Sequence, residues 1–155
     1  MKITLNDAEQ ALARHLAKSR YDNARSTGKP DQKMGGQSCE ETDLEGIAGE
    51  LVVCKRLNLY PDTDTDLIIY PKYDLLTHKG TKVDVKTTKY SSGRLLATMK
   101  KKVEDCDVYV LVVGEFPNYR IVGWAKSEEL ILKENIINLG HGEGYALNQS
   151  QLRSF

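Results

Sequence analysis

A chain of 155 residues is long enough for one domain with a buried core, and its 40% apolar and 28% charged residues are typical of globular proteins. No apolar run is long enough to cross a membrane, and no signal-peptide core begins the chain, so we expect a cytoplasmic protein without a membrane partner. The three scattered cysteines lack the paired spacing of a zinc site or a disulfide framework, which predicts reduced thiols.

The first third of the chain predicts two helices joined by a polar connection. Residues 7–25 carry apolar side chains at three-to-four spacing, and Thr4 or Asn6 is a candidate N-cap. The apolar stripe expected there consists of Ala8, Ala11, Leu12, His15 and Leu16. Residues 26–41 are turn-rich and predict a mobile connection.

The second helix is expected to run from Thr42 to Leu57. Thr42 and Glu45 have the spacing of a capping box. Gly46 and Gly49 lower helix propensity, so we expect them to allow close approach of a neighbouring element. Glu50 lies in an apolar environment, where a carboxylate needs a partner.

The rest of the chain predicts a mixed sheet. A continuous β-branched run at 107–114 is typical of a central strand buried on both faces, and 119–125 is expected to pair with it as a hairpin. The other expected elements are a strand at 66–70, a hairpin within 73–90, a basic helix at 94–104, a short helix capped by Ser127, an irregular segment at 136–144 and a short helix near Asn148.

This order predicts an α/β (α+β) fold in which a mixed β-sheet is flanked by helices on both sides. We expect a single domain over 1–155, with a catalytic core at 42–130 and a C-terminal segment at 131–155.

The stretch YDLLTHKGTKVDVKTTKY, residues 73–90, is the most informative in the chain. In a strand, Asp84 and Lys86 point to the same face, about 6–7 Å apart. A turn at His78 to Thr81 would fold Asp74 back beside Asp84. Two carboxylates and an ammonium at one place predict a site for Mg²⁺ and phosphate.

Charge is segregated around this stretch. Residues 72–102 contain nine basic side chains and only two acidic ones, Asp74 and Asp84, whereas both flanks are acidic. Such a segment is a plausible phosphate footprint, and a solvated surface is the ordinary alternative for its Lys100–Lys102 run. The residues expected to contact nucleic acid are Lys82, Thr88, Lys89, Arg94, Lys100, Lys101 and Lys102.

Phosphodiester hydrolysis needs an activated water and stabilisation of the developing charge. Mg²⁺ prefers oxygen ligands and often takes only one or two carboxylates, so Asp74 and Asp84 would bind it, with the Val85 carbonyl as a third ligand. Lys86 would orient the metal-bound water or help to remove its proton. Taken singly, an Asp-x-Lys strand is also a common exposed face.

Asp74, Asp84-Val85-Lys86 and the helical Glu50 together resemble the PD-(D/E)XK nuclease superfamily, the fold of type II restriction enzymes. The resemblance covers about residues 44–130. It implies a metal site on the central hairpin, with Asp74 and Asp84 at the acidic motif positions, Lys86 as the lysine and Glu50 completing the metal shell. Tyr73 stands before Asp74 in place of the usual proline.

The sequence therefore predicts a Mg²⁺-dependent endonuclease acting on DNA, with Mn²⁺ as a substitute cation. Because one site cuts one strand, a homodimer or higher homo-oligomer is expected for double-strand cutting. The small size resembles phage or mobile-element enzymes, either a homing endonuclease or a Holliday-junction resolvase. A catalytically silent nucleic-acid-binding module and a protein–protein adaptor remain as alternatives.

Overall fold

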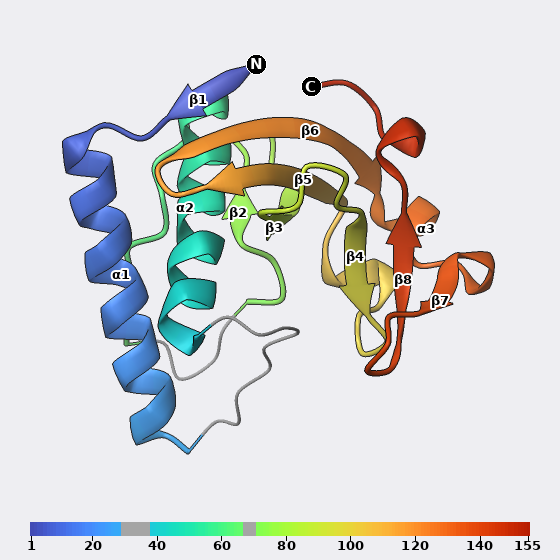
Figure 1. Cartoon of the computed structure of the whole chain (residues 1–155), viewed down its shortest axis with the longest axis horizontal. Helices are drawn as coiled ribbons and strands as arrows, with labels where there is room; N and C mark the ends of the chain where they lie inside the picture. The colour runs from blue at the N-terminus through green and yellow to red at the C-terminus, as the bar shows by residue number, and fades with distance from the viewer. Residues whose placement is uncertain (29–37, 67–70) are drawn as a thin grey trace.

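The computed structural model describes residues 1–28, 38–66 and 71–155, which form long helices, two β-sheets and short helical turns (Figure 1). The helices are α1 (Asp7–Ser26), α2 (Cys39–Leu57) and α3 (Ser127–Leu130), with 3₁₀ turns η1 (Val103–Asp105), η2 (Lys133–Asn135) and η3 (Gln149–Gln151). The strands are β1 (Lys2–Thr4), β2 (Leu75–Leu76), β3 (Lys82–Thr88), β4 (Leu95–Thr98), β5 (Val108–Glu115), β6 (Asn118–Lys126), β7 (Ile136–Asn138) and β8 (Glu143–Leu147).

The larger sheet is mixed and has the strand order β1-β6-β5-β3-β2. Strand β5 lies at its centre, parallel to β3 and antiparallel to β6. Successive residues of β5 enter different cores, since Val110 belongs to one hydrophobic cluster and Leu111 to the other. The predicted central strand, buried on both faces, and its hairpin with residues 119–125 are therefore confirmed.

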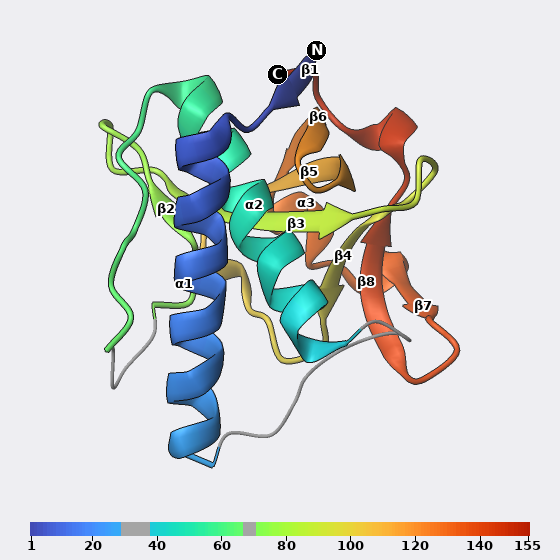
Figure 2. The same cartoon turned by 60° about the vertical axis from the view of Figure 1, so that its left-hand side comes forward.

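Each face of this sheet is covered by a different layer. Helices α1 and α2 pack on the face that carries Val83, Val85 and Val110. The smaller sheet, in the order β4-β8-β7, covers the opposite face together with α3, whose Leu130 is fully buried there (Figures 1 and 2). The expected mixed fold is confirmed, and most of the cover on the second face comes from strands and not from a helix.

Helix α1 begins after Asn6, which forms a capping box with Glu9, so the expected cap and span are confirmed. Its buried face was predicted only in part, since Leu16 is buried and Leu12 packs against the core. Ala13, Leu16 and Ala17 point inward, while Ala8, Ala11 and His15 are exposed. Small side chains are spread around this helix, so its sequence has no single apolar stripe, and packing against α2 selects the buried face.

Helix α2 begins three residues earlier than expected, because Ser38 and Glu41 form the capping box. Thr42 lies inside the helix, and Glu45 contacts the β5–β6 hairpin. Its carboxylate accepts hydrogen bonds from Phe116 N at 3.1 Å and from Tyr119 Oη at 2.5 Å. Two consecutive Ser/Thr-x-x-Glu patterns could cap this helix, and because Glu45 forms tertiary contacts, the earlier pattern forms the cap.

Two expected elements fall at the edges of the described residues. Of the connection predicted at 26–41, residues 29–37 lie outside them, and both ends of the segment belong to helices. Of the strand predicted at 66–70, residues 67–70 also lie outside.

The basic helix expected at 94–104 was wrong, because these residues form β4, a turn and η1. Leu95 and Ala97 alternate into the core with period two, a pattern that the run of lysines after it obscures. The segment 136–144 is not irregular, since it contains β7 and the start of β8. Because β8 pairs with β4, residues 131–155 are an integral part of the fold.

The remaining expectations concern two short helices, the cysteines and membrane-spanning segments. The short helix at 127 exists, but Ser127 is its first helical residue and not its cap. The short helix expected near Asn148 is the 3₁₀ turn η3. The three cysteines form no disulfide with one another. Among the described residues, no helix is long and apolar enough to cross a membrane.

Candidate active site on the β2–β3 hairpin

The predicted hairpin forms, and it brings Asp74 to Asp84. Leu75 pairs with Val83 in the antiparallel β2–β3 ladder, and the turn is closed by Thr77 N donating to Thr81 O at 3.0 Å. One residue before β2, Asp74 N donates to Val83 O at 2.9 Å. The backbone therefore fixes the Asp74 side chain beside the stretch from Asp84 to Lys86.

Asp84 is the buried centre of the site. Only 1% of its surface is exposed, and both carboxylate oxygens have a positively charged partner. Lys86 Nζ pairs with Oδ1, and Lys101 Nζ lies 2.5 Å from Oδ2. Burial opposes a charged Lys86, but Asp84 and Asp74 beside it raise the pKa of its ammonium. Lys86 therefore holds its proton in this state.

Asp74 lies on the open edge of β3 beyond the end of β2. Its Oδ2 accepts a hydrogen bond from Val85 N at 2.7 Å. In a strand the N–H and C=O of one residue point the same way, so the Val85 carbonyl is on this edge too. Burial, followed by the charge of Asp84, raises the pKa of the Asp74 carboxyl.

Glu50 approaches from the other side of the sheet. Its helix packs on the face of β3 that carries Val83 and Val85, whereas Asp84 and Lys86 point to the opposite face. Burial, together with the charge of Asp74, raises the pKa of Glu50 to about 8. Glu50 is therefore coupled to Asp74 and is separated from Asp84 by the strand.

The partner of Glu50 is Arg20, which the sequence analysis missed. Arg20 Nη1 lies 3.3 Å from Glu50 Oε2, and Nη2 donates to Asp62 O at 3.0 Å. A signal was present, because Arg20 continues the i, i+3, i+4 series of Ala13, Leu16 and Ala17 on the buried face of α1. A charged residue on that face needs a buried partner.

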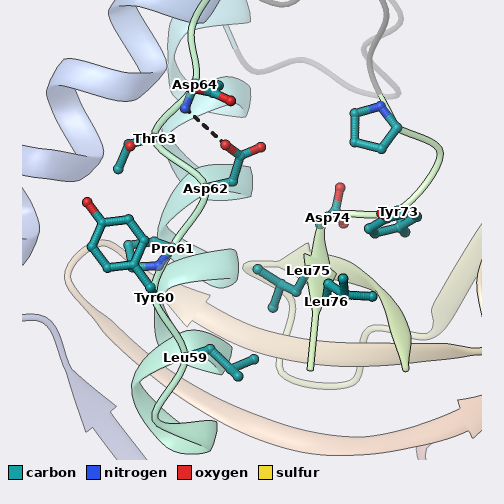
Figure 3. A pocket seen from close by; sticks show the side chains of 11 residues that line it. Leu59, Tyr60, Pro61, Asp62, Thr63, Asp64, Tyr73, Asp74, Leu75 and Leu76 are labelled. Atoms are coloured by element: carbon teal, nitrogen blue, oxygen red, sulfur yellow. Dashed lines mark hydrogen bonds between the residues drawn. The ribbon is translucent and has the colours of Figure 1, made fainter. Parts of the chain in front are cut away.

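A pocket of about 520 Å³ opens on the Asp74 side of the hairpin. Asp74, at the start of β2, faces the segment from Leu59 to Asp64 across it (Figure 3). The described residues that line this pocket include three aspartates and no lysine or arginine. Its acidic lining is unfavourable for phosphate, so an anionic ligand is expected to approach Asp84 from the side of its two lysines.

The residues predicted to contact nucleic acid are distributed over several elements. Lys82 and Thr88 share the face of β3 that carries Lys86, and Lys82 Nζ lies 5.7 Å from the centre of the Tyr73 ring. Lys89 Nζ lies 5.8 Å from the Tyr90 ring centre. Arg94, Lys100 and Lys102 are exposed, but Lys101 reaches Asp84 and belongs to the site itself.

The donor set is suited to a hard divalent cation. Asp74 and Asp84 offer carboxylate oxygens from two sides, and burial, followed by repulsion from a neighbouring carboxyl, raises the pKa values of Asp74 and Glu50. A cation would relieve this repulsion. Within the described residues no three His, Cys, Asp or Glu side chains form a metal-binding group, so two carboxylates, the Val85 carbonyl and water would be the ligands.

The chain matches no protein-family model, and comparison with curated proteins likewise finds no match. Its function must therefore be argued from the geometry of the site. That geometry combines a buried carboxylate with two ammonium groups, a second carboxylate on the strand edge and a third across the sheet.

Proposed function

We propose that this protein is a metal-dependent DNA endonuclease of the PD-(D/E)XK type, with water as the nucleophile. The observation that carries the proposal is the convergence of Asp74, Asp84 and Lys86 on one short hairpin, with Asp84 almost completely buried. Burying a carboxylate beside two lysines costs desolvation free energy. A function that uses these charges would explain why the chain keeps them there. Hydrolysis of a phosphodiester is a reaction that uses such a charge arrangement.

Each residue has a distinct role. Asp74 and Asp84 would hold Mg²⁺, or Mn²⁺ in its place, with the Val85 carbonyl on the same strand edge. When bound, the cation acidifies a bound water and neutralises charge that develops on the phosphate. Glu50, held by Arg20, supports the site through Asp74. Lys86 keeps its proton, so its Nζ orients the attacking water or donates to a phosphate oxygen.

DNA would approach Lys82, Lys86 and Thr88, which share one face of β3 and stay at least partly exposed. Lys89, Arg94, Lys100 and Lys102 would extend the contact to phosphates further along the strand. One such site cuts one strand. Double-strand cutting or junction resolution would therefore use a homodimer or a higher homo-oligomer, as in a homing endonuclease or a Holliday-junction resolvase.

A catalytically silent nucleic-acid-binding module is the second candidate, and one observation favours it. Lys86 and Lys101 already form ion pairs with the two oxygens of Asp84, which is the arrangement of a stable ion-pair network. In that case the basic face would bind DNA without cutting it. The third candidate is a protein–protein adaptor whose basic segment would contact an acidic partner.

A cleavage assay separates the three. The full chain is incubated with supercoiled, linear and four-way-junction DNA, in Mg²⁺, Mn²⁺ or EDTA, and Lys86→Ala is run beside the wild type. We expect cutting that requires the cation and falls at least about 100-fold in Lys86→Ala, which still binds DNA. Binding without cutting on every substrate supports the silent module, and absence of binding at low salt supports the adaptor.

A further inference from the structure

Lys101 has a position that differs from those of its neighbours in sequence. It lies in the turn after β4, between the exposed Lys100 and Lys102, but its side chain is only 23% exposed. Its Nζ donates to Asp84 Oδ2 at 2.5 Å and to Lys72 O at 2.9 Å. An ammonium has three donors, so these two bonds within the described residues leave one for a ligand.

The bond to Lys72 also bears on Asp74. Lys72 lies two residues before Asp74, so Lys101 connects the turn after β4 to the segment that positions the second carboxylate. Lys101 and Lys86 approach Asp84 through different oxygens. The Asp84 side chain is only 2% exposed, whereas the side chains of Lys86 and Lys101, 34% and 23% exposed, reach the surface.

A bound cation would change the net charge of this site. Two ammonium groups face two carboxyls, so the site is close to neutral with both carboxyls ionised. A divalent cation held by Asp74 and Asp84 would make the same site doubly positive, and it would compete with Lys101 for the Asp84 carboxylate. The lysine released from Asp84 then needs an anion, and a phosphodiester supplies one.

We propose that Lys101 is a second catalytic lysine, which closes Asp84 in the metal-free protein and donates to a non-bridging oxygen of the DNA phosphodiester when Asp84 binds the cation. This inference rests on the proposed nuclease function. It differs from the role expected for the Lys100–Lys102 run as a whole, because only Lys101 competes with the cation and contacts the reacting phosphate. Lys100 and Lys102 contact phosphates outside the site.

The test uses two measurements on which Lys101→Met has opposite effects. The first is calorimetric binding of Mn²⁺ to the DNA-free full chain. Because the substitution removes a competing charge, we expect affinity to rise about tenfold. The second is cleavage at saturating Mn²⁺, where we expect kcat to fall at least about tenfold from the loss of a phosphate donor.

Lys102→Met is the matched control, since it removes the same charge from the next residue. Its Mn²⁺ affinity should equal that of the wild type, and its cleavage defect should be a higher KM with kcat retained. Asp84→Asn identifies the Mn²⁺ that binds at this site. If Lys101→Met does not fold, Lys101→Gln replaces it, because the amide retains a donor for Lys72 O.

The proposal is overturned if Lys101→Met binds Mn²⁺ no more tightly than the wild type, or if its kcat is unchanged. A purely structural lysine would give weaker metal binding together with lower stability. Failure of the nuclease proposal is recognised separately, since the wild type would then cut no DNA, whereas the affinity measurement still reports whether Lys101 competes for Asp84.

Discussion

At the scale of single residues, the site consists of carboxylates in unequal environments. Asp84 is matched by two ammonium groups, whereas Glu50 has one guanidinium partner and a carboxyl neighbour in Asp74. Burial, followed by the charge of Asp74, raises the pKa of Glu50 to about 8. A buried carboxyl with a strongly raised pKa is a feature of functional sites and also of structural ion-pair networks.

The raised pKa predicts that stability depends on pH through Glu50. Its pKa rises from 4.5 to about 8 on folding, so the native state binds the proton more tightly between these values. Unfolding free energy must therefore fall as pH rises through this window. From pH 5 to pH 8 we expect the wild type to lose about 3 kcal/mol relative to Glu50→Gln.

Urea unfolding of both proteins at each pH, without metal, measures this difference. The exposed Glu104→Gln substitution removes the same charge without the burial and is the control. A stability difference between wild type and Glu50→Gln that stays constant over this pH range would contradict the assignment.

At the scale of elements, the contact between α2 and β3 fixes where Glu50 stands relative to the hairpin. Gly49 is the point of closest approach, because a Cβ there would overlap the buried Oγ1 of Thr87. Gly46, one turn earlier, has no atom within 4 Å of the place its Cβ would take. The sequence predicted close approach for both glycines, and the structure confirms it for Gly49 alone.

These two glycines form a matched pair of substitutions. Gly49→Ala should destabilise the protein by about 1–3 kcal/mol through overpacking. Gly46→Ala should be neutral or stabilise it by up to about 1 kcal/mol, since alanine favours the helix and meets no neighbour. Thermal and chemical denaturation check both. Equal effects of the two changes would show that α2 does not approach β3 as described.

Local patterns determined which elements the sequence could predict. The β2–β3 hairpin, central strand β5 and helix α1 each have a clear period or turn signal, and all three are confirmed. The helix predicted at 94–104 was wrong because the lysines of this segment outnumber the few alternating apolar residues of β4. Strands β4, β7 and β8 depend on each other for pairing, and such long-range pairing leaves little local signal.

At the scale of the whole molecule, the formal charge is zero, but the basic residues concentrate in 72–102. If this segment contacts DNA phosphates, binding must weaken as salt rises. The sequence predicted the cluster of Asp74, Asp84 and Lys86, because these residues are close in the chain. The pairing of Arg20 with Glu50 and the position of Lys101 depend on contacts between distant segments, so local pattern could not predict them.

Salt dependence gives a prediction for the exposed lysines. In EDTA, Lys102→Ala should weaken DNA binding and lower the slope of log affinity against log salt by about 1. Lys133→Ala, an exposed lysine outside the basic segment, is the control. Fluorescence anisotropy over a salt series measures both. An equal loss from the two substitutions would argue against a defined phosphate track.

The central claim is that the Asp84 site hydrolyses DNA with a bound divalent cation. Single-turnover nicking of a supercoiled plasmid, with the protein first stripped by EDTA and Mg²⁺ then added back, tests it most directly. The account predicts no nicking in EDTA, nicking on addition of Mg²⁺, and a rate at least about 1,000-fold lower for folded Asp84→Asn. Nicking by Asp84→Asn at the wild-type rate, or none by the wild type in Mg²⁺ or Mn²⁺, would contradict it.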